Sequence, residues 1–163
     1  MLFLTGDLHA EAATRLAAEL MTLDATGTDP ITLYVDSSGG ALEAAFVVTD
    51  TMALVRPRVR AHCLSRAGGP ALAVVALADQ RSAAPHARFQ LVQPEVQLAG
   101  TADQLTAEST HLQDLLRRFQ VQLADATGQP LEELVLDLRR GRYLDAQEAL
   151  SYGLIDTIGA PEA

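Results

Sequence analysis

Hydrophobic positions along the chain alternate between two spacings, and this alternation predicts strands followed by helices. Short apolar or β-rich runs occur at Leu2 to Leu4 and at Ile31 to Asp36, and helically spaced apolar residues follow each of them, over 8–20 and 41–55. The pattern returns as expected strands over 58–64 and 87–93, with a third helix over 69–78 between them. Such repeated β-α units imply a parallel sheet covered by helices, so the predicted class is α/β.

A long amphipathic helix is predicted over 101–126, with one apolar stripe made of Leu105, Leu112, Leu116, Phe119 and Leu123. At about 1.5 Å per residue this helix is roughly 39 Å long and must project beyond a small domain. We interpret its stripe as a contact with another subunit, the alternative being that it covers the chain's own core. Two short helices and a strand-like segment at 153–158 follow, and they complete one expected domain over 1–163.

Composition excludes several classes of partner. A net charge of −9 with a pI near 4.7 repels phosphate backbones and anionic lipid, so we expect no nucleic-acid partner. The longest apolar run, Ala71 to Ala78, is far shorter than the roughly 20 residues that span a bilayer, so no membrane association is expected. Cys63 is the only cysteine, and no secretory leader is recognisable, which predicts a cytoplasmic protein. Four scattered histidines show no metal-ligand spacing, so neither a metal nor another cofactor is predicted.

Two long stretches resemble one known family. These are "ITLYVDSSGGALEAAFVVTDTMALVRP" and "TGQPLEELVLDLRRGRYLDAQEALSYGLID", and they look like ClpP, the proteolytic subunit of the Clp protease. That family has a crotonase-type sheet and assembles as seven-membered rings. The intervening residues fit the family's handle region, about 93–128 here, a projecting strand and long helix that dock one ring against another.

The resemblance allows each position of the family's Ser-His-Asp triad to be examined separately. Matching the strand cysteine to Cys63 places Gly69 at the nucleophile, and a deletion placed before the turn would instead give Ala67. The histidine that precedes Gln-Pro in the family is Val92 here. The aspartate position is Gly141, four residues after a retained Asp137. Since triad chemistry needs an attacking oxygen and a proton acceptor, no catalytic residue is predicted at these positions.

The oxyanion hole is expected to be half retained. In the family one donor is the backbone N–H of the second glycine in the turn after a strand, and "SSGG" keeps that glycine as Gly40. The other donor is the N–H of the residue after the nucleophile, which here is Pro70, and proline has no N–H.

Other serines and histidines leave a relocated nucleophile as an alternative. Ser65 and His62 precede the "AGGP" turn, and Ser37 and Ser38 lie beside Gly40. The simpler interpretation is that the two turn serines satisfy backbone groups and that Ser65 is an ordinary polar residue at a strand end. His62 and Ser65 are expected on opposite faces of a strand, because Ser65 is three positions after His62. His86 and His111 are expected at ordinary surface or core positions.

Three departures from the family pattern concern assembly. The chain starts almost directly at the first sheet strand, without the family's axial segment, so ordinary docking to an AAA+ unfoldase is not expected. An acidic residue that pairs with the opposite ring is replaced, because Arg139 precedes Arg140 here. Only Gly100 remains of the glycines in the handle strand, which disfavours addition of a substrate strand.

The sequence therefore predicts a catalytically inactive ClpP-like protein that acts as an oligomeric scaffold or as a non-catalytic subunit. Its expected partners are copies of itself in a ring, or an active ClpP paralogue. Two alternatives stay open: an acyl-thioester or other small-ligand enzyme or binder on the crotonase-type fold, and a serine peptidase with a relocated nucleophile.

Overall fold

The computed structural model describes residues 1–161, and its centre is a seven-stranded sheet in the order β1-β2-β3-β4-β7, with β5 and β6 attached through β3. All pairs are parallel except β5 with β6. The strands are β1 (Leu2–Thr5), β2 (Ile31–Ser37), β3 (Val59–Gly68), β4 (Gln80–Ala83), β5 (Arg88–Leu91), β6 (Arg142–Asp145) and β7 (Thr157–Ile158). The α/β class with a parallel sheet is therefore confirmed.

Strand β3 serves two neighbours in succession. Its first half pairs with β4, and its second half, beyond an irregularity, pairs with β5. Against β2 the register moves from Val35↔Cys63 to Ser37↔Ala67, so β3 contains two extra residues there. The residues between, 64–66, are exposed, because the bulge turns them away from the core.

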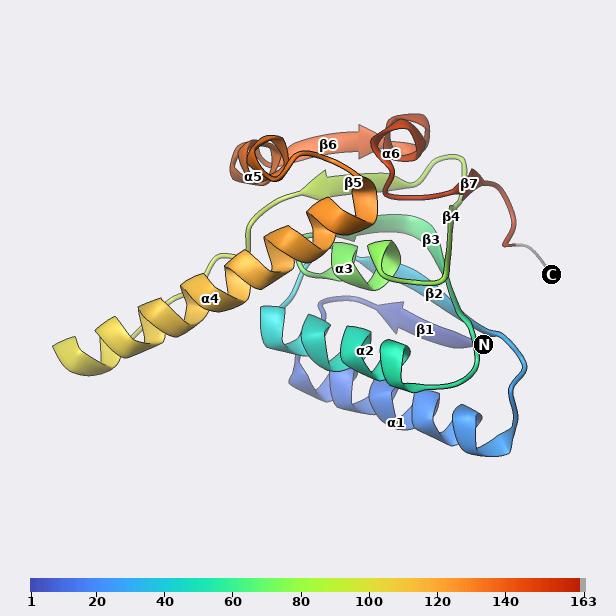
Figure 1. Ribbon diagram of the computed structural model, residues 1–163, viewed down its shortest axis with the longest axis horizontal. Helices are drawn as coiled ribbons and strands as arrows, with labels where there is room; N and C mark the ends of the chain where they lie inside the picture. Colours follow the sequence, from blue (N-terminus) through green and yellow to red (C-terminus); the bar gives the residue numbers. More distant parts are fainter. Residues whose placement is uncertain (162–163) are drawn as a thin grey trace.

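Helices over 10–26 and 42–54 cover one face of the sheet at the bottom of Figure 1, and helices over 131–140 and 146–152 lie beside β6 at the top. Alternate residues of β2 are buried, which places the core on a single face of that strand. Leu4, Leu33 and Val35 of this face are fully buried together with Leu16 and Val48 of the covering helices. The helices are α1 (Ala10–Thr26), α2 (Leu42–Leu54), α3 (Ala71–Ala76), α4 (Ala102–Thr127), α5 (Leu131–Arg140) and α6 (Ala146–Tyr152).

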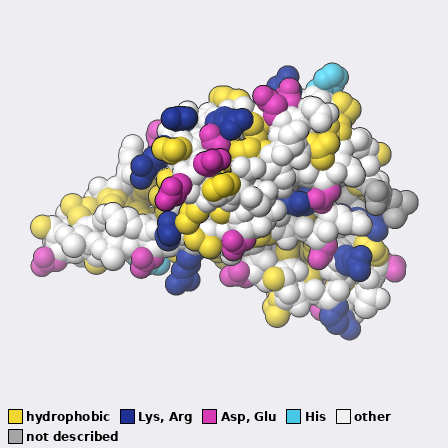
Figure 2. Space-filling model, turned by 45° about the horizontal axis from the view of Figure 1, so that its top comes forward, with side chains coloured by type: hydrophobic (Ala, Val, Ile, Leu, Met, Phe, Trp, Pro, Cys, Tyr) yellow, Lys and Arg dark blue, Asp and Glu magenta, His cyan; other side chains and the backbone are white. Residues whose placement is uncertain are grey.

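The long helix α4 projects from the body, as predicted (Figure 1). Thr101 and Gln104 form a reciprocal capping box at its start, and Gly128 ends it in the left-handed conformation. Its buried residues all lie in the second half, from Phe119 onward. In Figure 2 the projecting part carries hydrophobic side chains and few charges, whereas basic and acidic side chains intermingle where it joins the body.

Several predicted boundaries were wrong. Strands β4 and β6 were not predicted, and the helix expected over 69–78 is α3, which covers only Ala71–Ala76. Within the described chain, the expected handle strand "EVQLAGTA", residues 95–102, is irregular up to the start of α4 and pairs with no strand. It instead lies beside α4, where Val96 and Leu112 line one hollow and Leu98 and Leu105 line another. The chain's own handle segment therefore partly covers the apolar stripe of α4.

No helix in residues 1–161 is both long enough and apolar enough to cross a membrane.

Candidate functional site

The structure brings together the three positions that the resemblance matched to a triad. A Cβ built at Gly69 would lie 3.7 Å from Cγ1 of Val92. A Cβ built at Gly141 would lie 4.0 Å from Cγ2 of the same valine. Residues from the end of β3, from just after β5 and from the end of α5 therefore meet at one place. Side chains at these three positions would be in contact, which is the arrangement that a nucleophile, a base and an orienting group require.

Gly69 has the backbone shape of a sharp turn between strand and helix. Its φ is +50°, and its N–H donates to the carbonyl oxygen of Gln90 at 3.2 Å. Pro70 follows as the N-cap of α3, with φ −58°. Ala67, the position under the other alignment, lies inside β3, pairs with Ser37 and Phe89, and is 1% exposed. Gly69, and not Ala67, therefore occupies the turn.

The glycine turn after β2 lies against this cluster. The Cα of Gly39 is 3.7 Å from the Cβ position of Gly69. Gly40 has φ +142°, and a Cβ there would lie 2.1 Å from the carbonyl oxygen of Leu8. Around it, Leu8 donates to the Gly39 carbonyl and Ala41 donates to the Leu8 carbonyl. The N–H of Gly40 takes no part in these two hydrogen bonds.

The chemistry of the cluster follows from its side chains. Neither glycine carries a functional group, and the isopropyl group of Val92 cannot accept a proton. Gln90 brings the closest polar atom to Gly141, with Nε2 3.5 Å from the Cβ position. A carboxamide neither attacks a carbonyl nor exchanges a proton near neutral pH. The three matched positions therefore lie together and carry neither a nucleophile nor a base.

Asp137 does not replace the missing acid, because other residues hold its carboxylate. Its Oδ2 accepts hydrogen bonds from the Tyr152 hydroxyl at 3.0 Å and from Arg142 at 3.1 Å. Burial, followed by the hydrogen bond and charge of Asp137, raises the pKa of Tyr152 above its usual value. This arrangement joins α5 to α6.

A groove of about 390 Å³ runs from the glycine turn to the handle. Gly40 and Leu42 line one side, and Val96 and Leu112 line the other. Three carboxylates, those of Glu43, Glu95 and Glu108, also face it. These charges disfavour an anionic occupant and suit an apolar or cationic one.

The structure contains a serine-histidine pair that sequence reasoning missed. Nδ1 of His62 lies 2.8 Å from the hydroxyl oxygen of Ser82, and both residues are buried. The strand register explains this contact, because His62 on β3 is paired with Ser82 on β4, a strand that the sequence did not predict. Burial lowers the pKa of His62. Tyr34 packs edge-on against the imidazole, with ring centroids 5.7 Å apart.

The other candidate serines do not meet this histidine. Ser65 is exposed on the bulge of β3. The Ser37 hydroxyl donates to the carbonyl of Gly39 at 3.1 Å, and the Ser38 hydroxyl donates to Asp7 at 3.3 Å. Both turn serines therefore bond to groups of their own or a neighbouring turn.

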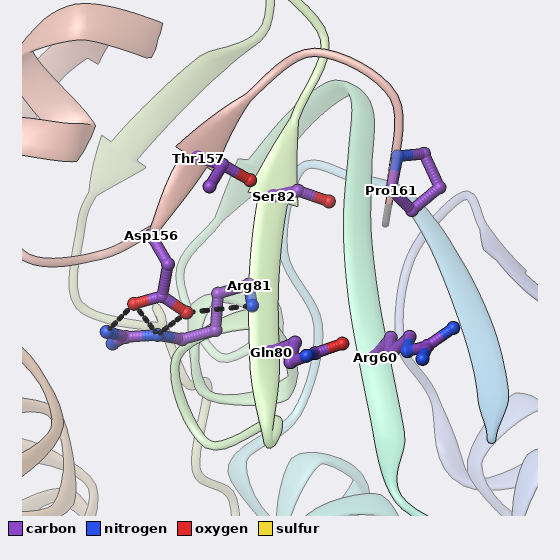
Figure 3. Close-up of a pocket in the computed structure, with 7 residues that line it drawn as sticks. All are labelled: Arg60, Gln80, Arg81, Ser82, Asp156, Thr157 and Pro161. Carbon is purple, nitrogen blue, oxygen red and sulfur yellow. Dashed lines mark hydrogen bonds and ion pairs between the residues drawn. The ribbon is translucent and has the colours of Figure 1, made fainter. Parts of the chain in front are cut away.

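Ser82 borders a small hollow of about 150 Å³ near the end of the described chain (Figure 3). Its hydroxyl points from β4 toward β3, and Pro161 lies beyond β3 in this view, well above Arg60. Arg81 binds the carboxylate of Asp156 through Nε at 3.1 Å and also donates to two backbone carbonyls. The guanidinium holds the pKa of Asp156 below its usual value. This pair fastens the C-terminal segment to β4.

The other histidines and arginines singled out in the sequence are exposed. His86 is exposed in the turn before β5, and His111 is exposed on the projecting half of α4. Arg139 and Arg140 are exposed at the end of α5. Within residues 1–161, no group of three or more His, Cys, Asp or Glu side chains is placed to hold a metal ion.

Comparison with known families gives a match along nearly the whole chain. The family model described as Clp protease matches residues 1–162. The matched span includes the glycine turn, the turn at Gly69, the projecting helix and the C-terminal helices.

Proposed function

The chain belongs to the Clp protease family, and from that premise we propose that it is a catalytically inactive member that acts through assembly. It forms a homo-oligomeric scaffold or serves as a non-catalytic subunit beside an active paralogue. We propose that residues 1–163 form one domain, with the handle over about 93–128. The buried free thiol of Cys63 fits a reducing cytoplasmic setting.

The observation that carries the proposed inactivity is the contact of Gly69, Val92 and Gly141. They adjoin as a triad would, and none of them supplies an oxygen nucleophile or a base. Pro70 also has no N–H for a developing oxyanion. An enzyme with one impaired triad residue would retain part of its rate of peptide hydrolysis. Loss of the nucleophile, the base and one oxyanion donor together would leave substrate binding without hydrolysis.

The assembly role rests on the projecting half of α4. Its stripe residues Leu105 and Leu112 are half-buried by the chain's own handle segment, and the rest of this half is largely exposed. A projection of this kind adds nothing to the core of a monomer and suits contact with another subunit. The exposed Arg139 and Arg140 replace the family's acid-arginine arrangement, so we propose a ring-on-ring contact that differs from the usual one. We do not expect ordinary docking of an AAA+ unfoldase.

Labelling with a serine-reactive phosphonate, combined with peptide hydrolysis, tests the inactivity. We expect no adduct by intact mass and no turnover above buffer. An active ClpP is the positive control. Stoichiometric labelling at any serine would overturn the proposal. Ser82→Ala, Ser65→Ala and Ser38→Ala would then show whether a relocated nucleophile is responsible.

Light scattering on a size-exclusion column tests the assembly. We expect a multimer that Leu105→Glu together with Leu112→Glu converts to smaller species. Ala107→Glu together with Thr110→Glu, on the exposed opposite side of the same part of α4, is the matched control for added charge. A strictly monomeric parent protein would count against the scaffold.

The N–H of Gly40 favours one second candidate, a binder of acyl thioesters in the manner of crotonase relatives. The retained glycine supplies one of the two donors that such a site uses, and Pro70 removes the other. Calorimetry with an acyl-CoA tests it, and we expect no heat of binding if assembly is the function.

A further inference from the structure

A second hollow, of about 190 Å³, lies behind the glycine turn and is lined by Ser38, Arg66, Gly68, Arg88, Gln90 and Tyr143. The bulge of β3 creates its rim, because it turns Arg66 outward. Gly68 leaves its floor open, since this residue has no side chain. The register places Arg66 beside Arg88, and Gln90 between Gly68 and Tyr143. These polar side chains therefore come from three adjacent strands and the turn after β2.

Positive charge exceeds negative charge in this hollow. Arg66 and Arg88 are direct neighbours on parallel strands, and like charges in that arrangement destabilise a sheet. Nε of Arg66 lies 3.4 Å from Oδ1 of Asp36, an oxygen that is buried without a hydrogen bond. The lining of the hollow thus holds two guanidinium groups and no carboxylate, while Asp36 stands beside Arg66 and Asp145 opposite Arg88. The chain as a whole carries −9, so this local surplus runs against its composition.

The guanidinium of Arg88 is engaged less by the protein than that of Arg66. Across residues 1–161 it forms no ion pair, and its guanidinium hydrogen bond goes to the carbonyl of its own neighbour, Ala87, at 3.4 Å. Asp145 is its partner in the β5–β6 register, but the Asp145 carboxylate accepts the N–H of Glu148 at 2.8 Å in a capping box. The planar fork of Arg88 is therefore available to a ligand.

We propose that this hollow, which we call the arginine pocket, binds a carboxylate group. Guanidinium groups match carboxylates through paired hydrogen bonds, and the Tyr143 hydroxyl and the Gln90 amide supply neutral donors. The lining itself carries two guanidinium groups and no carboxylate, and Asp36 and Asp145 beside it offset part of that charge, which favours a monoanion over a phosphate dianion. The volume equals about six water molecules at roughly 30 Å³ each, so it admits a short acid or the end of a peptide and excludes a nucleotide.

The arginine pocket contains none of the three positions matched to a triad, although Gln90 lies between the pocket and that cluster. Its Cβ is 3.6 Å from the Cβ position of Gly68, and its Nε2 is 3.5 Å from that of Gly141. A carboxylate that draws the Gln90 amide toward the arginine pocket would leave the triad-like cluster more apolar. Binding of a carboxylate to the arginine pocket requires no catalytic residue. We assign it a role in recognition by the assembled protein.

Side-chain NMR of the arginine Nε–H groups in the full chain tests the proposal. The probes are propionate and acetyl-Ala-Ala, the latter as free acid and as amide. We expect both acids to shift the signals of Arg66 and Arg88 and the amide to leave them unchanged. Tighter binding of the peptide acid than of propionate identifies a peptide end as the source, and equal binding identifies a small organic acid. Inorganic phosphate is expected to bind no tighter than propionate.

Two variants at one position sharpen the test. R88Q is expected to weaken binding of the acids at least tenfold, since a hydrogen bond to a charged group contributes about 1.5–3 kcal/mol. R88K keeps the charge without the fork and is expected to lie between R88Q and the parent. R117Q, on the exposed face of α4, is the control and should bind as the parent does. Thermal melting of each variant confirms that it is folded.

Four results would overturn the proposal: no shift of either arginine, an equal shift with the amide, equal weakening by R117Q, or tighter binding of phosphate. A fifth result would also reject the proposal. If the arginine signals respond to protein concentration and not to the acids, the pocket is a contact between subunits.

Discussion

Two glycine turns lie side by side at the carboxyl ends of β2 and β3, and they differ in why they need glycine. At Gly40 both the backbone conformation and the lack of space for a side chain require glycine, since φ is +142° and a Cβ would collide with the Leu8 carbonyl oxygen. At Gly69 φ is +50°, but no atom lies nearer than 3.7 Å to the Cβ position. The first turn is fixed by packing, whereas the second has room for the side chain that a nucleophile would need.

The comparison distinguishes a glycine that the fold requires from positions that catalysis would use. The match to the Clp protease family covers both turns. Gly40 must stay for the bridge between Leu8 and the turn to form. Residues at 69, 92 and 141 carry chemistry in the family pattern and little of the packing. Substitutions at these three positions would therefore leave the fold intact, which is the physical basis of the proposed function.

Gly40→Ala should produce the largest effect. The new methyl group collides with backbone, which cannot move as a flexible side chain would, and the φ is unfavourable for any other residue. We expect the free energy of unfolding to fall by about 3 kcal/mol or more, measured by urea denaturation. Gly39→Ala is the matched control, because nothing lies within 4 Å of its Cβ position, and should change stability by about 0.5 kcal/mol or less. Equal losses from both variants would contradict the comparison.

Gly68→Ala should have an intermediate effect. Its Cβ would lie 2.6 Å from the carbonyl oxygen of Ser38, so the two turns must separate slightly. We expect a loss of about 2 kcal/mol in the same urea experiment. The arginine pocket should also change, because the methyl group would project beside Gln90. A loss smaller than that of Gly69→Ala would show that the turns are not packed as described.

Gly69→Ala should cost about 1 kcal/mol, the penalty of the left-handed conformation alone. Gly69→Ser should cost a similar amount and should acquire no phosphonate label, because Val92 cannot act as a base. Labelling of this variant, read by intact mass, would mean that another group activates the serine, and would weaken the account of the cluster.

The smallest expected effect concerns His62, which lies earlier on β3. This prediction tests whether the role of His62 is only structural. Burial lowers its pKa in the folded state from 6.5, so the unfolded state binds the proton more readily. Stability should therefore be greatest above pH 6.5 and decline as the pH falls from 7 to 5.5. His62→Gln should flatten this dependence in urea titrations at several pH values. Stability that rises on acidification over this range would reverse the expected sign.

The sequence predicted the elements with strong local signals and missed those fixed by distant contacts. The long helix was predicted within a residue at each end, because Thr101 and Gly128 mark its caps. Strand β4 was missed, since "QRSA" is short and polar and becomes a strand only through pairing with β3 and β7. The contact of His62 with Ser82 depends on that strand and was missed for the same reason. The irregular handle segment was wrongly expected to be a strand, as it has no strand partner among the described residues.

For the candidate site, resemblance supplied the positions and the structure supplied their contact. Nothing in the spacing of Gly69, Val92 and Gly141 along the sequence shows that they adjoin. Their meeting depends on β3 pairing with β5 and on α5 ending at Gly141 in a left-handed turn, with φ +64°. The arginine pocket was not predicted at all, because the bulge that turns Arg66 outward comes from the β2–β3 register.

Native mass spectrometry of the protein purified from its own cells, after treatment with a serine-reactive phosphonate, tests the central claim most directly. One spectrum reports the number of subunits, any catalytic partner and the mass of this chain. We expect a multi-subunit complex in which this chain carries no adduct, while any active paralogue is labelled. A monomer, or a chain whose mass includes the phosphonate, would contradict the account.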